Sequence, residues 1–278
     1  MKKTVKNRGT QAAVYVFLTL LALVTIFPFV YILLIAFGKN IVGTQALFPK
    51  EFTLEHFRRL FTETHFWDWL GNSLVVSSVT MVATVVLVSV SVYVFSRLRF
   101  RGKEKLFRFV LLIQVFPLML SMVSIFRLFV ALGLLNDLKG LILVYSAISS
   151  AGLVLMAKGF FDTIPFELDE AAMVDGATRF QILRYVILPL ARPMLAVVAV
   201  QSFVIAYNEY GIASTVMTSG IDTMPLAVGL QSMTVNQYGT NWSLYCAAAV
   251  LGAVPMMILY YAMQRHFLGG LSEGAVKM

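Results

Sequence analysis

Long apolar segments separated by short polar ones run through the whole chain. A helix needs about 20 residues to cross a hydrocarbon core about 30 Å thick, and six segments meet that length. The first, second and last contain no charged residue, and the third and fourth each contain a long charge-free run. The pattern therefore predicts an all-α polytopic membrane protein with six transmembrane helices, at about 12–37, 71–96, 107–131, 139–160, 193–218 and 242–264.

The fifth segment has the weakest pattern, because Glu209 interrupts its apolar run. Pro28, Pro117 and Pro255 fall inside other segments. We expect each proline to kink its helix, since neighbouring spans can satisfy the freed backbone groups. No low-complexity linker or short repeat divides the chain. Residues 1–278 are therefore predicted to form a single transmembrane domain.

Composition argues against several classes of function. Hydrophobic residues make up 59% of the chain and charged residues only 13%, whereas soluble domains have about 25% charged residues. The lone Cys246 cannot form an intramolecular disulfide, and His56, His65 and His266 are scattered along the chain. The sequence thus predicts no catalytic, cofactor-binding or metal-binding residue, which argues against an integral-membrane enzyme.

The net charge of +8 is sorted by side of the membrane. If the N-terminus is cytoplasmic, 16 of the 22 Lys and Arg residues lie in the inside segments 1–11, 97–108, 158–192 and 265–278. Short cytoplasmic loops rich in Lys and Arg follow the positive-inside rule. We therefore expect both termini to be cytoplasmic, the basic run 97–108 to anchor the chain at lipid head groups, and no nucleic acid to bind.

The long outward segment, about 38–70, is rich in aromatic residues interspersed with charges. Such a composition is typical of an amphipathic segment at the membrane interface, where aromatic belts occur. We expect this segment to be an interfacial anchor, with a partner-docking surface as the alternative. Its aromatic residues include Phe57, Phe61, Phe66, Trp67 and Trp69.

The segment between the fourth and fifth spans, about 162–192, is longer and more acidic than a topological loop requires. Pro165 and the carboxylates after it suit the first turn of a helix, so a short helix is predicted over 167–175. Gly176 follows, where helices often end in a left-handed residue. A second short helix is predicted from an apolar stripe at helical spacing, formed by Phe180, Ile182, Leu183, Val186 and Ile187.

A motif lies within this acidic segment. Glu170-Ala171-Ala172 is followed after three residues by Gly176, and after nine more by Val186, one residue and Leu188-Pro189. This pattern resembles the EAA loop of ATP-binding-cassette (ABC) importer permeases, including both spacings, with Val186 where the family usually has Ile. The resemblance implies the type I ABC importer permease fold. It also implies that the loop is a coupling helix that docks on a cytoplasmic ATPase subunit.

The resemblance assigns ATPase coupling to Glu170, Ala171, Ala172, Asp175, Gly176, Val186, Leu188 and Pro189. The chain has no GxxxxGK[ST] phosphate loop of its own, so we expect a partner chain to bind ATP and Mg²⁺. The implied partners are a dimer of MalK-like ATPase subunits, a second, MalF-like permease and an extracytoplasmic sugar-binding protein. The implied location is a prokaryotic inner (plasma) membrane.

Nearly the whole chain resembles the carbohydrate branch of this family, in particular the MalG-type permeases of maltose and maltodextrin importers. Residues 114–117, 158–165, 226–231 and 269–277 carry this resemblance. It implies translocation of maltose, maltodextrin or a related oligosaccharide. It also implies that the external loop 221–241 reaches into the binding protein's cleft, an ordinary ordered connection being the alternative. The polar residues expected to face the binding protein are Asn236, Gln237, Tyr238 and Asn241.

Glu209, next to Asn208, is the one acidic residue within a predicted span. Intramembrane charges are costly and mark a pathway or a helix contact. Asn208 and Glu209 are therefore predicted either to lie on the translocation path or to hold helices together. A permease for another solute, such as glycerol phosphate, stays an alternative. A secondary transporter using Glu209 as an ion site is less favoured, since such proteins typically show paired broken helices in repeated halves.

Overall fold

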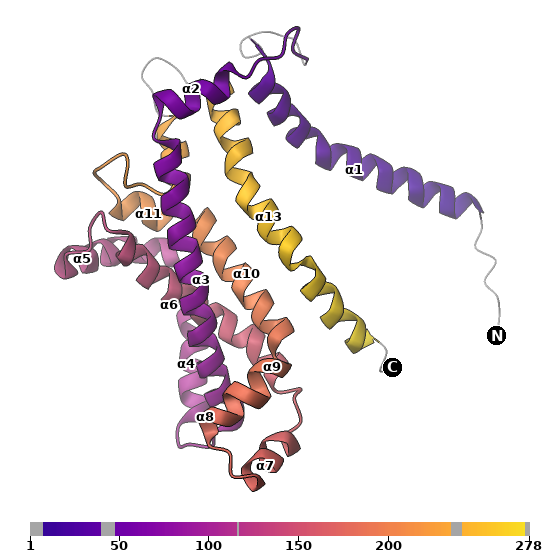
Figure 1. Ribbon diagram of the computed structural model, residues 1–278, viewed down its shortest axis with the longest axis vertical. Coiled ribbons are helices and arrows are strands. Elements are labelled where there is room, and N and C mark those ends of the chain that lie inside the picture. The colour runs from indigo at the N-terminus through magenta and orange to yellow at the C-terminus, as the bar shows by residue number, and fades with distance from the viewer. Residues whose placement is uncertain (1–7, 40–47, 116, 235–240, 276–278) are drawn as a thin grey trace. The chain divides into compact units, whose positions relative to one another are not determined.

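The computed structural model describes residues 8–39, 48–115, 117–234 and 241–275. The chain forms two compact units, one of residues 1–64 with 230–253 and the other of residues 65–229 with 254–278. Helices build both units (Figure 1). The only β pairing in the described ranges is a single antiparallel bridge between Gly38 and Phe52. The predicted all-α fold class is therefore confirmed.

The first unit packs around the end of its first helix. Ala36 lies there, buried against Cys246 and Ala247 of the last helix. The rings of Phe37 and Phe57 lie 4.7 Å apart beside this cluster, an aromatic contact that adds to the buried area. The helices of the unit are α1 (Arg8–Phe37), α2 (Glu55–Glu63) and the first part of α13 (Trp242–Ala275).

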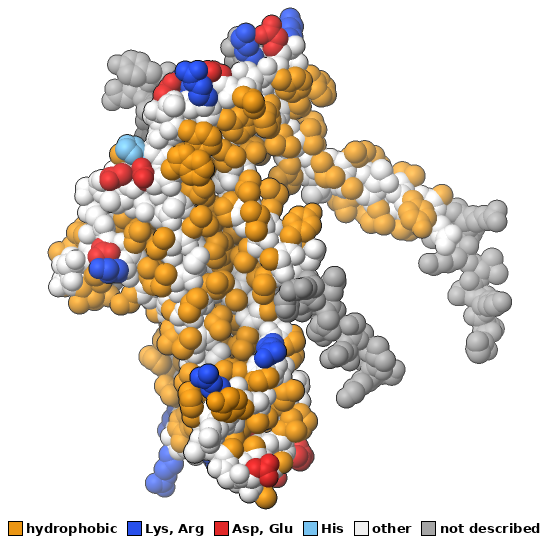
Figure 2. Space-filling view, in the orientation of Figure 1, with side chains coloured by type: hydrophobic (Ala, Val, Ile, Leu, Met, Phe, Trp, Pro, Cys, Tyr) orange, Lys and Arg blue, Asp and Glu red, His pale blue; other side chains and the backbone are white. Residues whose placement is uncertain are grey.

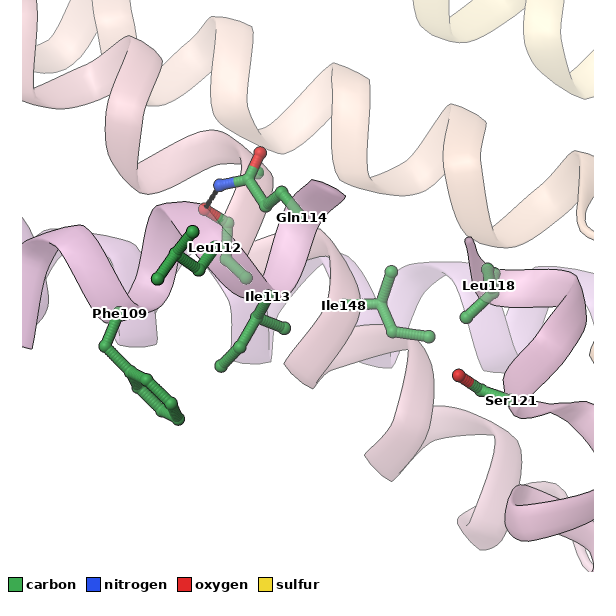
Figure 3. A pocket seen from close by; sticks show the side chains of 9 residues that line it. Phe109, Leu112, Ile113, Gln114, Leu118, Ser121 and Ile148 are labelled. Carbon is green, nitrogen blue, oxygen red and sulfur yellow. Dashed lines mark hydrogen bonds between the residues drawn. The ribbon is translucent and has the colours of Figure 1, made fainter. Parts of the chain in front are cut away.

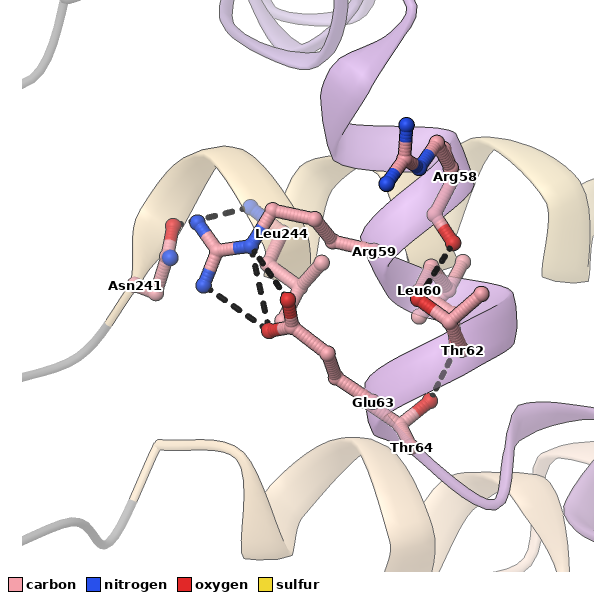
Figure 4. Close-up of polar contacts among 8 residues, drawn as sticks. All are labelled: Arg58, Arg59, Leu60, Thr62, Glu63, Thr64, Asn241 and Leu244. Carbon is pink, nitrogen blue, oxygen red and sulfur yellow. Dashed lines mark hydrogen bonds and ion pairs between the residues drawn. The ribbon is translucent and has the colours of Figure 1, made fainter.

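Helix α2 is amphipathic and lies within the predicted interfacial segment. Leu60 is fully buried, whereas Arg59 pairs with Glu63, one turn away, at 2.9 Å on the exposed side (Figure 4). Phe66 and Trp69, which we also expected at the interface, are buried in the second unit. The reason is that the next helix begins at Phe66, several residues earlier than the apolar pattern indicates.

Three long helices form the centre of the second unit, and small hydroxyl side chains are buried along one of them. α3 (Phe66–Arg97) packs against both α6 (Leu138–Phe161) and α10 (Arg192–Asn208). The spacing of four, three and four residues places these buried hydroxyls on one face of α3. Small residues allow transmembrane helices to approach closely. On α3 they are Ser73, Ser77, Thr80 and Thr84.

The structure contains enough apolar helix for the predicted membrane topology. Four helices in the described residues are long and apolar enough to cross a membrane, and up to six spans result if each of two bent helix pairs counts as one. One pair, Lys103–Val115 with Leu118–Leu132, is bent by 89°, and the other, Arg179–Leu190 with Arg192–Asn208, by 82°. The predicted all-α polytopic fold class is confirmed, with four to six spans on this count. Hydrophobic side chains cover much of the face shown in Figure 2.

Two predicted spans are not single helices. The third consists of α4 (Lys103–Val115), the 3-10 turn η1 (Leu118–Ser121) and α5 (Met122–Leu132), with Pro117 as the N-cap of the turn. The fifth, predicted over 193–218, ends at Asn208, and α11 (Gly211–Val216) follows as a separate helix. Glu209 between them has extended backbone. By contrast, α1 and α13 continue through Pro28 and Pro255.

Candidate coupling site

The acidic segment folds into helix α7 (Glu167–Val174), a turn and a second helical stretch. Glu167, Asp169 and Glu170 lie in the first turn of α7, where the helix dipole favours negative charge. Gly176 follows the helix with φ of +81°, a conformation that glycine adopts without the usual steric penalty. The predicted helix and its left-handed glycine are both confirmed.

A capping box begins the second helical stretch. The Thr178 hydroxyl accepts the Gln181 N–H at 3.4 Å, and the Gln181 side chain accepts the Thr178 N–H at 2.7 Å, so two backbone donors are satisfied reciprocally. Ile182 and Ile187 are fully buried, but Phe180, predicted on the same apolar face, is exposed. The stretch consists of α8 (Arg179–Ile182), the π-helical turn η2 (Leu183–Ile187) and α9 (Leu188–Leu190).

The eight predicted coupling residues fall into two groups by burial. Ala172, Val186 and Leu188 pack against the core of the second unit, and Pro189 is half-buried. These residues hold the loop in place. The others form a surface that a partner can reach, and they are Glu170, Ala171, Asp175 and Gly176.

The α7 helix is attached to the end of α3 through a buried arginine. Arg97 Nε lies 2.8 Å from Asp169 Oδ2, and both side chains are almost completely buried. The Arg97 guanidinium also donates a 2.8 Å hydrogen bond to the carbonyl oxygen of Ile164. It lies over the Phe166 ring, 4.4 Å from the ring centroid. The Arg97 side chain thus contacts two residues just before α7 and one residue within it.

Burial raises the pKa of the Asp169 carboxyl, while the nearby guanidinium groups of Arg97 and Arg179 lower it. The net direction is upward. A buried carboxylate is costly unless it is paired. Arg97 from α3 and Arg179 from α8 therefore partly offset the cost of burying the ionised Asp169 carboxylate.

Neither Arg97 nor Asp169 was predicted as a site residue. Arg97 is one of six basic residues in 97–108, so its charge had been explained as part of a topology anchor. Asp169 is one of three acids in a helix N-terminal turn. Asp169 precedes Ala172 by three residues, so both lie on the same side of the helix. Because the sequence motif assigns Ala172 to ATPase docking, this spacing alone does not indicate that Asp169 faces the protein interior.

Glu209 holds the break between α10 and α11. Its carboxylate accepts the backbone N–H groups of Ile212 at 2.8 Å and Ala213 at 3.2 Å, and the hydroxyl of Tyr145 in α6 at 2.5 Å. These contacts match the helix-contact alternative of the two predicted for Glu209. Its neighbour Asn208 is exposed and donates to the Val204 carbonyl of its own helix at 3.0 Å.

The first part of the external loop is hydrogen-bonded to the beginning of α3. Trp69 Nε1 donates to the Ile221 carbonyl at 2.6 Å. Asn72 Nδ2 donates to the carbonyls of Asp222 at 2.8 Å and Met224 at 3.1 Å. This part of the loop is therefore held to the helix bundle.

The remaining predicted loop contacts lie further along the chain. Asn236, Gln237 and Tyr238 lie outside the described residues. Asn241 lies at the beginning of α13, where its side-chain oxygen accepts the Leu244 N–H at 3.1 Å (Figure 4). In the structure Asn241 thus acts as a helix cap.

An open, mostly apolar pocket of about 620 Å³ lies between α4, η1 and α6. Phe109, Leu112, Ile113 and Ile148 line it (Figure 3). The Gln114 side chain at its edge donates a hydrogen bond to the Ala151 carbonyl at 2.5 Å. A sugar site needs several free hydrogen-bonding groups, so this lining does not mark one.

The apolar helices and the angled helical pair outside them define a permease of the type I ABC importer class. Residues 86–272 match the family described as "Binding-protein-dependent transport system inner membrane component", and the chain belongs to this family. It is thus a multi-pass membrane protein and a transport subunit rather than an enzyme. The family resemblance inferred from the EAA motif is confirmed.

Relatives and solved structures agree over nearly the full length. The chain is 37% identical to the maltodextrin transport system permease protein MdxG of Bacillus subtilis, covering 95% of each chain. It is 36% identical to the maltose/maltodextrin transport system permease protein MalG of Vibrio vulnificus, covering 99% of this chain and 98% of that one. A subunit of a bacterial ABC transporter involved in alginate import has the same fold, with a TM-score of 0.84 at 23% identity, over 96% of this chain and 99% of that chain.

Proposed function

We propose that this chain is the MalG-type permease of an importer for maltodextrin or a related oligosaccharide. The observation that carries the proposal is sequence identity above 35%, along almost the entire chain, to permeases named for maltose and maltodextrin. A family member with an unrelated substrate would be expected to resemble these permeases mainly in the EAA loop, whereas this chain resembles them along nearly its whole length. Glycerol phosphate stays as a competing substrate.

The substrate test uses the complete importer. The tagged chain is purified in mild detergent with its co-purifying subunits, which we expect to be a second permease, an ATPase dimer and an extracytoplasmic binding protein. ATPase activity in reconstituted vesicles is then compared for binding protein supplied with maltotriose, maltose or glycerol 3-phosphate. Stimulation by the two glucose oligosaccharides alone supports the proposal, and stimulation by glycerol 3-phosphate alone contradicts it.

We propose that both termini and α7 are cytoplasmic, and that the surface formed by Glu170, Ala171, Asp175 and Gly176 docks on the ATPase. Its exposure supports this role, and acidic side chains lie at the end of the second unit that carries α7 (Figure 2). Orientation is tested with a Val174→Cys variant in a Cys246→Ser background, since Val174 is 88% exposed. Labelling by an impermeant maleimide from the extracytoplasmic side would contradict the proposed orientation.

We propose that residues 233–240 of the external loop contact the binding protein and help to release the sugar. The hydrogen bonds from Trp69 and Asn72 hold the earlier part of the loop, which narrows the contact to the later part. Deleting 233–240 should abolish uptake while the ATPase still co-purifies. A replacement by Gly and Ser of equal length separates loss of side chains from loss of length, and normal uptake by the deletion variant would remove the idea.

A further inference from the structure

The attachment of α7 to the rest of the second unit depends on an unusual contact. Asp169 is the only buried residue of this eight-residue helix. A surface helix normally docks through an apolar stripe, but the large apolar side chains Leu168, Met173 and Val174 are all exposed. Of the α7 side chains, the one most deeply enclosed is therefore a carboxylate, and its ion-pair partner, Arg97, belongs to α3.

Arg97 connects three elements at one point. It is the last residue of α3, it donates to Ile164 just beyond the end of α6, and it pairs with Asp169 in α7. A guanidinium is planar and carries donors in a fixed fork, so it can satisfy several partners in one geometry. Separating the pair would leave the Arg97 guanidinium without its carboxylate and Asp169 with only Arg179 nearby, and breaking a buried ion pair is unfavourable.

We propose that Arg97 is the positioning residue that makes α7 and α3 move as one body, so that motion of α7 on the ATPase reaches the membrane helices through α3. This inference rests on the proposed docking of α7. The physical basis is that packed elements transmit motion as rigid bodies when their contacts have discrete arrangements. α3 is suited to pass the motion on, because it packs against both α6 and α10.

The test compares Arg97→Gln, Asp169→Asn and the double variant in the complete importer. Each single variant removes one partner of the ion pair, and the double variant removes both partners of the same pair. We expect the single variants to keep the co-purifying ATPase and at least half of the basal ATPase activity. Stimulation by sugar-loaded binding protein should fall at least tenfold in each single variant and by a similar factor in the double variant, because all three lose the same contact between α3 and α7. Arg101→Gln, an exposed neighbour, is the matched control and should behave as the parent.

Measuring the distance between α7 and the end of α3 distinguishes loss of this attachment from a general loss of stability. Spin labels at Glu167→Cys and Arg99→Cys, both exposed positions, report the distance between α7 and the end of α3 in a Cys246→Ser background. The parent should give one narrow distance distribution, and Arg97→Gln should broaden it at least twofold. Arg97→Lys keeps the charge but not the fork, and this milder variant allows the same measurement if Arg97→Gln does not assemble.

Three results would overturn the inference. They are normal coupling in Arg97→Gln, an unchanged distance distribution in both arginine variants, and a double variant that is impaired as much as the two single effects combined. Failure of the proposed docking looks different. In that case the ATPase is absent from the parent complex itself, or is retained in every variant of the exposed α7 surface.

Discussion

The Glu209 carboxylate accepts the Tyr145 hydroxyl at 2.5 Å and the first free backbone N–H groups of α11. An acid that breaks the apolar pattern of a span thus ends one helix, begins another and ties both to α6. All of these partners belong to the chain itself, so the contacts require neither a substrate nor an ion. This relationship favours the helix-contact alternative for Glu209 and leads to the first prediction.

Tyr145→Phe should lower the free energy of unfolding by about 1.5–3 kcal/mol, the usual contribution of a hydrogen bond to a charged group. Glu209→Gln keeps an acceptor for the N–H groups and should retain more than half of the uptake rate, whereas Glu209→Ala should lose most of it. Thermal unfolding in detergent and vesicle uptake measure the two effects. Abolished uptake by a normally folded Glu209→Gln protein would show that the charge itself acts in transport.

Gly229 should not tolerate a side chain, because a Cβ atom at this position would overlap the indole ring of Trp69. Gly229→Ala must displace Trp69 and its hydrogen bond to Ile221, so we expect a loss of about 1–3 kcal/mol in unfolding free energy, as for overpacked cores. Gly71→Ala is the matched control, since a Cβ there meets no atom within 4 Å. Equal melting temperatures for the two variants would contradict the close packing of the loop on α3.

Hydropathy predicted helices well where apolar runs are long and unbroken. The predicted span 139–160 and the observed helix Leu138–Phe161 differ by one residue at each end. The breaks were harder to predict, because they depend on partners distant in sequence: Glu209 ends a helix through contacts that include Tyr145 of α6. Similarly, the observed helices continue through Pro28 and Pro255, while Pro117 lies beside a break.

Only the local features of the coupling site could be predicted, because its other contacts join residues distant in the sequence. The EAA spacing located α7 and its terminal glycine, which depend on local backbone rules. The ion pair between Arg97 and Asp169 joins residues 72 positions apart in the sequence. Six basic residues in 97–108 offered equivalent charges, so no local rule selects the one that is buried.

The effect of Arg97→Gln should depend on pH. The pKa of Asp169 is already raised by burial, so the folded protein binds this proton more readily than the unfolded chain does. The ionised carboxylate therefore costs stability at high pH; the cost shrinks once the pH falls below the raised pKa and is gone below the lower pKa of the unfolded chain. Removing Arg97 takes away a cation that lowers this pKa, so the pKa rises further and the cost at high pH increases.

The melting temperature of Arg97→Gln should therefore fall furthest below that of the parent at high pH, and the deficit should shrink as the pH falls below the raised pKa of Asp169. Arg179 and Tyr93 also interact electrostatically with Asp169, but both are present in each protein, so the comparison isolates Arg97. In an Asp169→Asn background the same arginine substitution should give a deficit that does not vary with pH. A pH-independent deficit with Asp169 intact would contradict the assignment.

The same substitution at two adjacent alanines of the EAA motif should have different effects, lowering stability at one position and ATPase binding at the other. Ala171 is exposed, whereas Ala172 packs against the core of the second unit. Ala172→Leu adds volume to a packed site and should cost about 1–3 kcal/mol of unfolding free energy. Ala171→Leu should change stability by less than about 0.5 kcal/mol but reduce the amount of co-purifying ATPase, because the added side chain projects from the proposed docking surface.

Each alanine variant is the control for the other, since the two positions are adjacent in one helix and the added volume is the same. Melting temperature and the ratio of ATPase to permease after purification are measured on the same samples. The expected result is a lower melting temperature for Ala172→Leu alone and a lower ATPase ratio for Ala171→Leu at parental stability. If Ala171→Leu keeps the full ATPase ratio, the exposed side of α7 is not the docking surface, and the burial of its neighbour must then be explained by packing alone.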